Sequence, residues 1–314
     1  MWPLLLLLIY GVCLIVASLA GGWLPAIMRL THTRMQLMLS LVGGLMIGVA
    51  LLHLLPHASV ETESLDMASS ACLVGLLAMF LTIRVFPVHQ HCPGHADTRA
   101  VHHAAHGHPR LAASDARDDH DDHDHDNDAS RHRFSWIGLF LGLSIHTTID
   151  GIAVAASVAA DAKHGSAIAL LGAGTFLAVL LHKPLDSFSL MSLMVAGNWT
   201  ARLRNVVNTV FALICPLGAL IFFFGTREMS HGSHVAVGCA LGFSAGVFLG
   251  IALADLLPEI QFHRHDRIKL TAALLVGVAL AYAIGLFEPP HAHDAHARET
   301  VAPSTIHEHG GGER

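Results

Sequence analysis

The chain has 314 residues, of which 53% are hydrophobic and 13% charged, and its formal net charge is −6. Such a composition is unusual for a soluble domain and typical of a helical membrane protein. The five cysteines form no CxxC pair, which argues against a disulfide framework or a thiolate metal site. We expect a lipid bilayer around the chain and no nucleic-acid partner.

Eight apolar segments follow one another, and each is long enough to cross about 30 Å of hydrocarbon as a helix. They are residues 3–25, 36–58, 68–88, 135–160, 166–197, 206–226, 235–259 and 268–287. The sequence therefore predicts an all-α polytopic membrane protein with eight spans. No basic stretch precedes the first segment, so we interpret it as a retained span and not as a signal peptide.

A repeated motif links spans 2 and 7. Residues 44–57, GLMIGVALLHLLPH, match residues 246–259, GVFLGIALADLLPE. The two spans run in opposite directions, so we predict a 3+2+3 arrangement in which spans 1–3 and 6–8 are inverted repeats, a common build of transporters. The predicted units are the first repeat (1–88), a loop (89–133), spans 4 and 5 (134–200), the second repeat (201–288) and a tail (289–314).

The arginines and lysines predict the orientation. If the N-terminus lies outside, most of them fall in loops that face the inside, as the positive-inside rule requires. Both termini are then outside and the 89–133 loop is cytoplasmic. The compact chain favours a cytoplasmic (inner or plasma) membrane as its location.

Histidine is unusually frequent, with 26 residues against 18 lysines and arginines together. Many histidines lie in the 89–133 insert, whose acidic core is too charged and too poor in apolar residues to fold. We interpret the insert as a flexible loop that chelates metal weakly, with His120, His123 and His125 as ligands. A solvated tether that binds no metal is the alternative. The tail at 289–314 is interpreted in the same way.

Two polar pairs lie inside spans 4 and 5. His146 and Asp150 are four residues apart in span 4. His182 and Asp186 repeat this spacing in span 5, and on a helix it places both members of a pair on one face. Because a five-residue turn, residues 161–165, is predicted to join these antiparallel spans, the four side chains would meet near mid-membrane.

Two imidazoles and two carboxylates form a ligand set that suits Zn(II). Ionisable side chains are costly at this depth, so four of them indicate a functional site. Two polar pairs that only close a helix interface are the alternative interpretation.

Neighbouring residues are expected to shape this site. Lys183 would lie at its rim and hold the empty site together, or else bond backbone carbonyls. Thr147 would add a weak oxygen ligand or bond its own helix. Pro184 is expected to bend span 5 and free a carbonyl, while Gly138 and Gly142 would let span 4 approach its neighbour closely.

These features together resemble the ZIP (Zrt/Irt-like) family of metal transporters. The family motif His-Asn-x-x-Asp-Gly is matched in span 4 by His146, Thr147, Asp150 and Gly151. The motif His-Glu-x-Pro-His-Glu is matched in part in span 5 by His182, Lys183 and Asp186. Thr147 and Lys183 replace the family's ligands to a second metal, so the resemblance implies one metal with the ammonium in place of the other.

The resemblance also has mechanistic implications. It implies uptake of metal into the cytoplasm, often by a homodimer, and an elevator-like slide of spans 1, 4, 5 and 6 against spans 2, 3, 7 and 8. A branch of the family with His-Lys in span 5 resembles this chain most.

The repeat places a polar pair at the end of each matching span. His53 and His57 end span 2 on the outside, and we predict that they relay metal into the site. Asp255 and Glu259 end span 7 on the inside, and we predict that they pass metal to the cytoplasm. Interfacial polar residues at helix ends are the alternative for both pairs.

The residues leave other classes open. A cation exporter combines similar features, but usually with six spans and no such repeat. A metal sensor or receptor without transport, or an intramembrane zinc hydrolase, would also use this ligand set, although no HExxH motif is present. We expect no enzymatic activity and no catalytic cofactor. Zn(II) is the expected substrate, and Fe(II), Mn(II), Co(II) and Cd(II) fit similar ligands.

Overall fold

The computed structural model describes residues 2–27, 32–85, 125–163, 171–228, 233–262 and 267–285. Side chains are described for most of these residues, but not for positions 32, 125–135, 163, 255 and 257–262. The predicted chelating histidines His120 and His123 lie outside the described residues.

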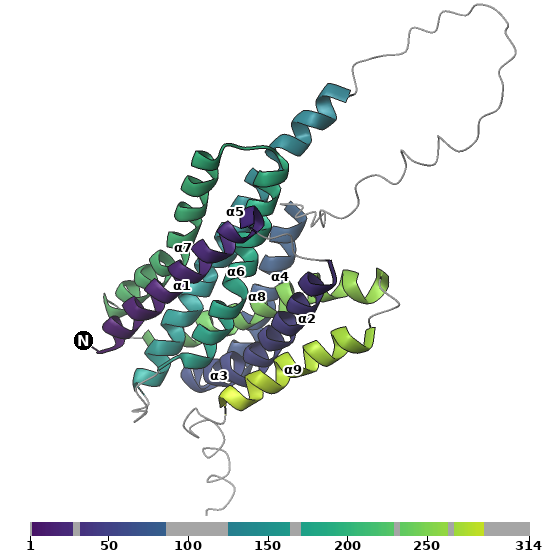
Figure 1. Cartoon of the computed structure of the whole chain (residues 1–314). Helices are drawn as coiled ribbons and strands as arrows, with labels where there is room; N and C mark the ends of the chain where they lie inside the picture. Colours follow the sequence, from purple (N-terminus) through teal and green to yellow (C-terminus); the bar gives the residue numbers. More distant parts are fainter. Residues whose placement is uncertain are drawn as a thin grey trace, which may run out of the picture.

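The described residues are almost entirely helical, and none of them forms a strand (Figure 1). The helices in chain order are α1 (Trp2–Ile27), α2 (His32–Val49), the short π-helix η1 (Ala50–Leu54), α3 (Leu55–Thr62), α4 (Leu65–Val85), α5 (His125–Lys163), α6 (Ala173–Ala196), α7 (Ala201–Glu228), α8 (Ser233–Phe262) and α9 (Arg267–Gly285). This confirms the predicted all-α fold.

Eight of the described helical segments are long and apolar enough to cross a membrane, as predicted. One of them, Thr33–Thr62, combines α2, η1 and α3 into a single span. An α-helix satisfies its backbone polar groups internally, so these apolar runs can lie in hydrocarbon. The π-helix interrupts the second span at His53, and π-turns of this kind occur frequently at functional sites.

Two helix starts differ from the predicted ranges. α6 begins at Ala173 and not at residue 166. Gly172 precedes α6 with φ of 67°, a left-handed conformation that glycine adopts without steric cost, and its N–H donates to Asp161 Oδ2 at 2.7 Å. α5 begins at His125, so the helix extends into the predicted 89–133 loop (Figure 1).

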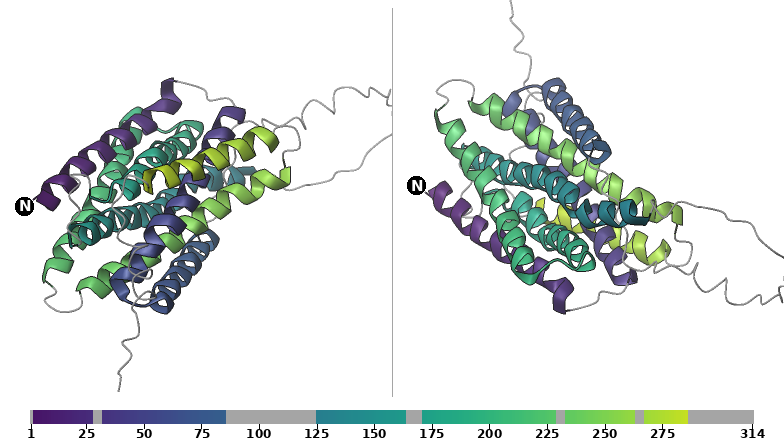
Figure 2. Two further views of the ribbon diagram at one scale, coloured as in Figure 1. Left: turned by 90° about the horizontal axis from the view of Figure 1, so that it is seen from below. Right: turned by 90° about the horizontal axis from the view of Figure 1, so that it is seen from above.

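The helices pack in two groups. One group contains α1, α5, α6 and α7, where α5 packs on α7 and α1 packs on α6 and α7. The other contains α2, η1, α3, α4, α8 and α9, where α2 packs on α9 and α4 on α8 (Figure 2). Helices α5 and α8 form the main contact between the groups. These are the two sets of spans that the family resemblance implies as moving parts.

Matching glycines of the repeated motif make equivalent contacts. A Cβ on Gly44 of α2 would meet the Leu274 carbonyl of α9, and a Cβ on Gly246 of α8 would meet the Cys72 carbonyl of α4. The motif in α2 therefore packs through its glycine on α9, and the motif in α8 packs through its glycine on α4. Small residues permit such close crossings between membrane helices.

Candidate metal centre

The four predicted ligands converge between α5 and α6. One ligand atom from each of His146, Asp150, His182 and Asp186 lies within 4.8 Å of the others. His146, Asp150 and His182 are buried, and the side chain of Asp186 is 16% exposed. Asp186 therefore belongs to the cluster, although span 5 matches the family motif only in part.

His146 lies between the two carboxylates. Its Nδ1 is 3.5 Å from Asp150 Oδ1, and its Nε2 is 3.6 Å from Asp186 Oδ2. All four of these buried atoms lack a hydrogen-bond partner among the described residues. Buried polar atoms are normally satisfied, so unpartnered ligand atoms that face one another fit a site for a cation.

The backbone orients His182. Its Nδ1 is 2.8 Å from the Ala178 carbonyl, which can only accept, so Nδ1 carries the proton. In the neutral ring, Nε2 then carries the lone pair, and it lies 3.3 Å from Asp150 Oδ2 and 3.9 Å from Asp186 Oδ2. A lone pair beside two carboxylates needs a cation or a proton between them. Metal-binding histidines are commonly oriented in this way by a bond to the other nitrogen.

Lys183 was predicted at the rim, and this is wrong, because its side chain is fully buried within the cluster. Its Nζ donates to Asp150 Oδ2 and to the Thr147 hydroxyl, both at 2.8 Å, and lies 3.6 Å from Asp186 Oδ2. Because the ammonium is shielded from solvent, it binds the nearest carboxylates. Thr147 thus accepts from Lys183 within the site.

Aromatic side chains from α7 and α8 complete the walls of the metal site, and the sequence did not indicate this role for them. Phe211 of α7 lies under Lys183 Nζ at 5.5 Å, a cation–π contact. Phe248 of α8 contacts the His182 ring edge-on, with ring centroids 6.0 Å apart. No spacing in the sequence distinguishes these two phenylalanines from core residues, because their role depends on how the helices pack.

The predicted role of Gly138 is wrong, because a Cβ at this position would meet no atom within 4 Å. Gly151, next to Asp150, takes the expected role: its Cβ would clash with the Cys215 carbonyl of α7. α6 continues through Pro184, whose backbone packs against Gly21 of α1. The close helix crossings at the site therefore involve α5 with α7 and α6 with α1.

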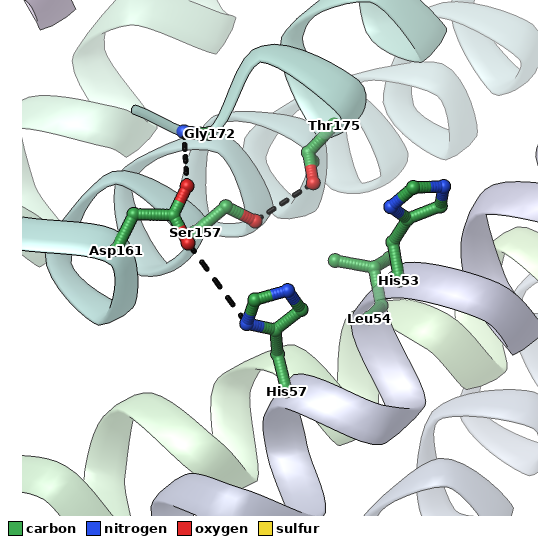
Figure 3. Close-up of a pocket in the computed structure, with 7 residues that line it drawn as sticks. All are labelled: His53, Leu54, His57, Ser157, Asp161, Gly172 and Thr175. Carbon is green, nitrogen blue, oxygen red and sulfur yellow. Dashed lines mark hydrogen bonds and ion pairs between the residues drawn. The ribbon is translucent and has the colours of Figure 1, made fainter. Parts of the chain in front are cut away.

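The predicted entrance histidines line one pocket beyond the four ligands. His53 of η1 and His57 of α3 share it with Leu54, Ser157, Asp161, Gly172 and Thr175 (Figure 3). His57 Nδ1 lies 3.9 Å from Asp161 Oδ1. Asp161 was not among the predicted site residues, although it follows Asp150 by eleven residues, about three helical turns, on the same face of α5.

The other predicted site residues are only partly described. Asp255 and Glu259 lie in α8, but the placement of their side chains is outside the described part of the structure. His125 is the first residue of α5, and its side chain is not described either. The proposed exit path and the loop chelation therefore stay predictions.

In the described part of the chain, eight helices are long and apolar enough to span a membrane, and a cluster of His and Asp side chains lies among them. These features indicate a membrane protein with a candidate metal site. A sequence model of the ZIP zinc transporter family matches residues 4–285. The chain therefore belongs to the ZIP zinc transporter family, as its motifs indicated. Family membership points to a transporter and not to an enzyme.

Several similar proteins are named as zinc transporters. Zinc transporter ZIP9-B of Xenopus laevis is 36% identical over 145 residues, which cover 45% of this chain and 46% of that protein. Zinc transporter ZIP9 of Micropogonias undulatus is 34% identical, with 45% and 44% covered. Zinc transporter 3 of Arabidopsis thaliana is 25% identical over 151 residues, with 45% and 42% covered. The chain matches less than half the length of these relatives.

Proposed function

We propose that this protein moves divalent metal ions, Zn(II) in the first place, across the membrane into the cytoplasm. The observation that supports this most is the buried cluster of His146, Asp150, His182 and Asp186, whose unpartnered ligand atoms face one another. Imidazole and carboxylate ligands bind zinc at about 2.0–2.2 Å, and they also accept Fe(II), Mn(II), Co(II) and Cd(II). Relatives named as zinc transporters favour zinc.

Lys183 changes the electrostatics of transport. Two carboxylates and one ammonium leave the empty site with one net negative charge, and a divalent ion would make the loaded site positive. Lys183 donates to Asp150 Oδ2, while Asp150 Oδ1 faces His146. The two oxygens of this carboxylate can therefore bind the ammonium and the metal ion at the same time. We infer that repulsion between the ammonium and the bound ion weakens binding and helps the ion to leave.

The accessible side of the site supports inward movement. Asp186 is the only one of the four ligands with an appreciably exposed side chain. It lies one turn after His182 on α6, and the positive-inside rule assigns that end of the helix to the cytoplasm. In this proposal, the structure represents a state whose site opens inward, with both termini outside.

The movement itself is proposed as a slide of one helix group along the other. The four ligands and Lys183 all lie on α5 and α6, within a single group. Displacing this group against α8 would carry the whole site without breaking it. The entrance role of His53 and His57, the exit role of Asp255 and Glu259, assembly as a homodimer and location in a cytoplasmic membrane complete the proposal.

Radioactive zinc uptake into sealed proteoliposomes tests this function. We expect saturable uptake by the wild-type protein and its loss in His146→Ala and His182→Ala. Exposed His234, at the start of α8, provides the matched control, since His234→Ala should transport normally. Inside-out orientation of the same vesicles distinguishes import from export.

A sensor that binds metal without moving it is the second candidate, because Lys183 already occupies part of the site. Zinc binding with no uptake in either vesicle orientation would favour the sensor and reject transport.

A further inference from the structure

We propose that His57 and Asp161 form an outer binding site for a divalent metal ion, with His53 beside them, where the ion is held before it reaches the four central ligands. The proposal rests on the transport function above, and it adds Asp161 as a ligand that sequence analysis did not select. It concerns the pocket between the two helix groups shown in Figure 3.

The two ligand atoms are separated by nearly the right distance. His57 Nδ1 and Asp161 Oδ1 are 3.9 Å apart. Two ligands about 2.0–2.2 Å from one tetrahedral zinc ion lie roughly 3.4 Å from each other, so a small closure would let both bind the same ion. At 3.9 Å, the pair is too wide for a direct hydrogen bond.

Both carboxylate oxygens of Asp161 have defined positions. Oδ2 accepts the N–H of Gly172 at 2.7 Å, which fixes the carboxylate against the start of α6. Oδ1 then faces His57 across the pocket (Figure 3). Oriented ligands of this kind lose less conformational freedom when a metal binds.

His53 is oriented by α9, a helix of its own group. Its Nε2 lies 2.8 Å from the Ala281 carbonyl of α9, which can only accept, so Nε2 carries the proton and Nδ1 is the nitrogen able to bind a metal. Among the described residues, His53 is not part of a group of three or more potential ligands that could hold one ion. It therefore lines the pocket as a neighbour of the His57–Asp161 pair.

The pocket is aligned with the central site. Asp161 lies about 16 Å along α5 from Asp150, and Ser157 lies between them on the same face. On α6, Thr175 lies seven residues, about two turns, before His182. The hydroxyls of Ser157 and Thr175 bond each other at 2.7 Å and line the pocket.

Buried apolar residues lie along both helices between the two sites. Val154 lies between Asp150 and Ser157 on α5, Val179 lies between Thr175 and His182 on α6, and both are at most 1% exposed. We expect an ion to pass them only when the helices move. The outer site is also shared between α3 and α5, which belong to different groups, so sliding of one group would change the separation of its two ligands.

The outer site should bind the metal ion more weakly than the central site does. Two protein ligands, supplemented by water, bind an ion more weakly than four, and the side chains of His57 and Asp161 are 30% and 14% exposed. A weak and accessible site can load quickly and release its ion to a stronger one.

A spectroscopic experiment tests the outer site without requiring transport. We expect Asp161→Cys in purified protein to develop cadmium–thiolate ultraviolet absorption at low Cd²⁺ concentration, and the added His57→Ala to raise the required concentration about tenfold. Asp66→Cys, at an exposed position in the first turn of α4, is the control for a lone thiol. If Asp161→Cys and Asp66→Cys titrate alike, or His57→Ala has no effect, there is no shared site.

Zinc uptake tests the role of the site. We expect His57→Ala and Asp161→Asn each to raise KM for zinc about tenfold and to lower the maximal rate much less. Asp161→Asn keeps an acceptor for the Gly172 N–H, and Asp161→Glu keeps the carboxylate and should restore part of the affinity. The double variant should be no worse than the single ones, because both residues act on one ion.

Two results would overturn the proposal. One is an unchanged KM in both single variants. The other is a loss of maximal rate at constant KM in Asp161→Glu as well as Asp161→Asn, which would assign Asp161 a structural role. Cadmium binding in the absence of any uptake would support the outer site and reject the proposed transport function, so the two failures are distinguishable.

Discussion

The central cluster and the outer pocket use similar side chains in different surroundings. The central cluster offers two histidines and two aspartates from two helices of one group, and three of these residues are buried. The outer pocket offers His57 and Asp161 from helices of different groups, and both side chains are partly exposed. In the proposed function, the site that lies within one helix group holds the ion through the movement, whereas the site shared between the groups exchanges it. On this proposal, placement relative to the helix groups, and not ligand type, separates the two roles.

Removing a central ligand should have the largest effect. His146→Ala or His182→Ala should reduce zinc uptake by about 100-fold or more, since loss of even an outer-shell partner costs about 10–100-fold. The measurement is initial uptake in proteoliposomes, with His234→Ala as the control. Uptake within threefold of wild type would show that the central cluster does not carry the ion.

The close crossing beside the central site provides the next prediction. Gly151→Ala places a Cβ against the Cys215 carbonyl, so we expect a loss of stability of about 1–3 kcal/mol and reduced uptake. Gly138→Ala on the same helix is the matched control, because its Cβ would meet no atom within 4 Å. Thermal unfolding in detergent measures both variants. Equal melting temperatures for the two would contradict the assigned role of Gly151.

Replacing Lys183 should change how tightly the central site binds zinc and how fast it releases the ion. Lys183→Met removes the ammonium that binds Asp150, so we expect zinc to bind about tenfold more tightly, or about 1.4 kcal/mol, and to turn over more slowly. Thr147→Val removes the other partner of Lys183 without changing charge, and its effect should be smaller. Equilibrium binding and uptake measure the two quantities. Weaker binding in Lys183→Met would show that the ammonium supports the loaded site.

The smallest effect is expected at the hydroxyl pair between the two sites. Thr175→Val breaks the 2.7 Å bond to Ser157, and such bonds between membrane helices contribute about 0.6 kcal/mol on average. We expect KM for zinc to change by less than about threefold, in line with that energy. Thr82→Val removes a bond within α4 alone and serves as the control. A tenfold change in KM for Thr175→Val would place the hydroxyl pair among the metal ligands.

Periodicity and length were sufficient to predict the helices and the convergence of the four polar side chains. Apolar runs predicted eight spans because a bilayer requires about 20 such residues per helix. The four-residue spacing of His146 with Asp150, and of His182 with Asp186, predicted one shared face because a helix repeats every 3.6 residues. These are local properties, so the order of residues along the chain determines them.

Contacts between distant helices could not be predicted in this way. The burial of Lys183, the clash that requires Gly151, and the meeting of His57 with Asp161 all depend on which helices become neighbours and how closely they cross. Many similar apolar faces could pack together, and sequence spacing does not rank them. The sequence by itself determined the spans and the paired ligands, and the tertiary structure decided where the lysine lies and which carboxylate faces the outer histidine, because only packing brings separate helices within ångströms of each other.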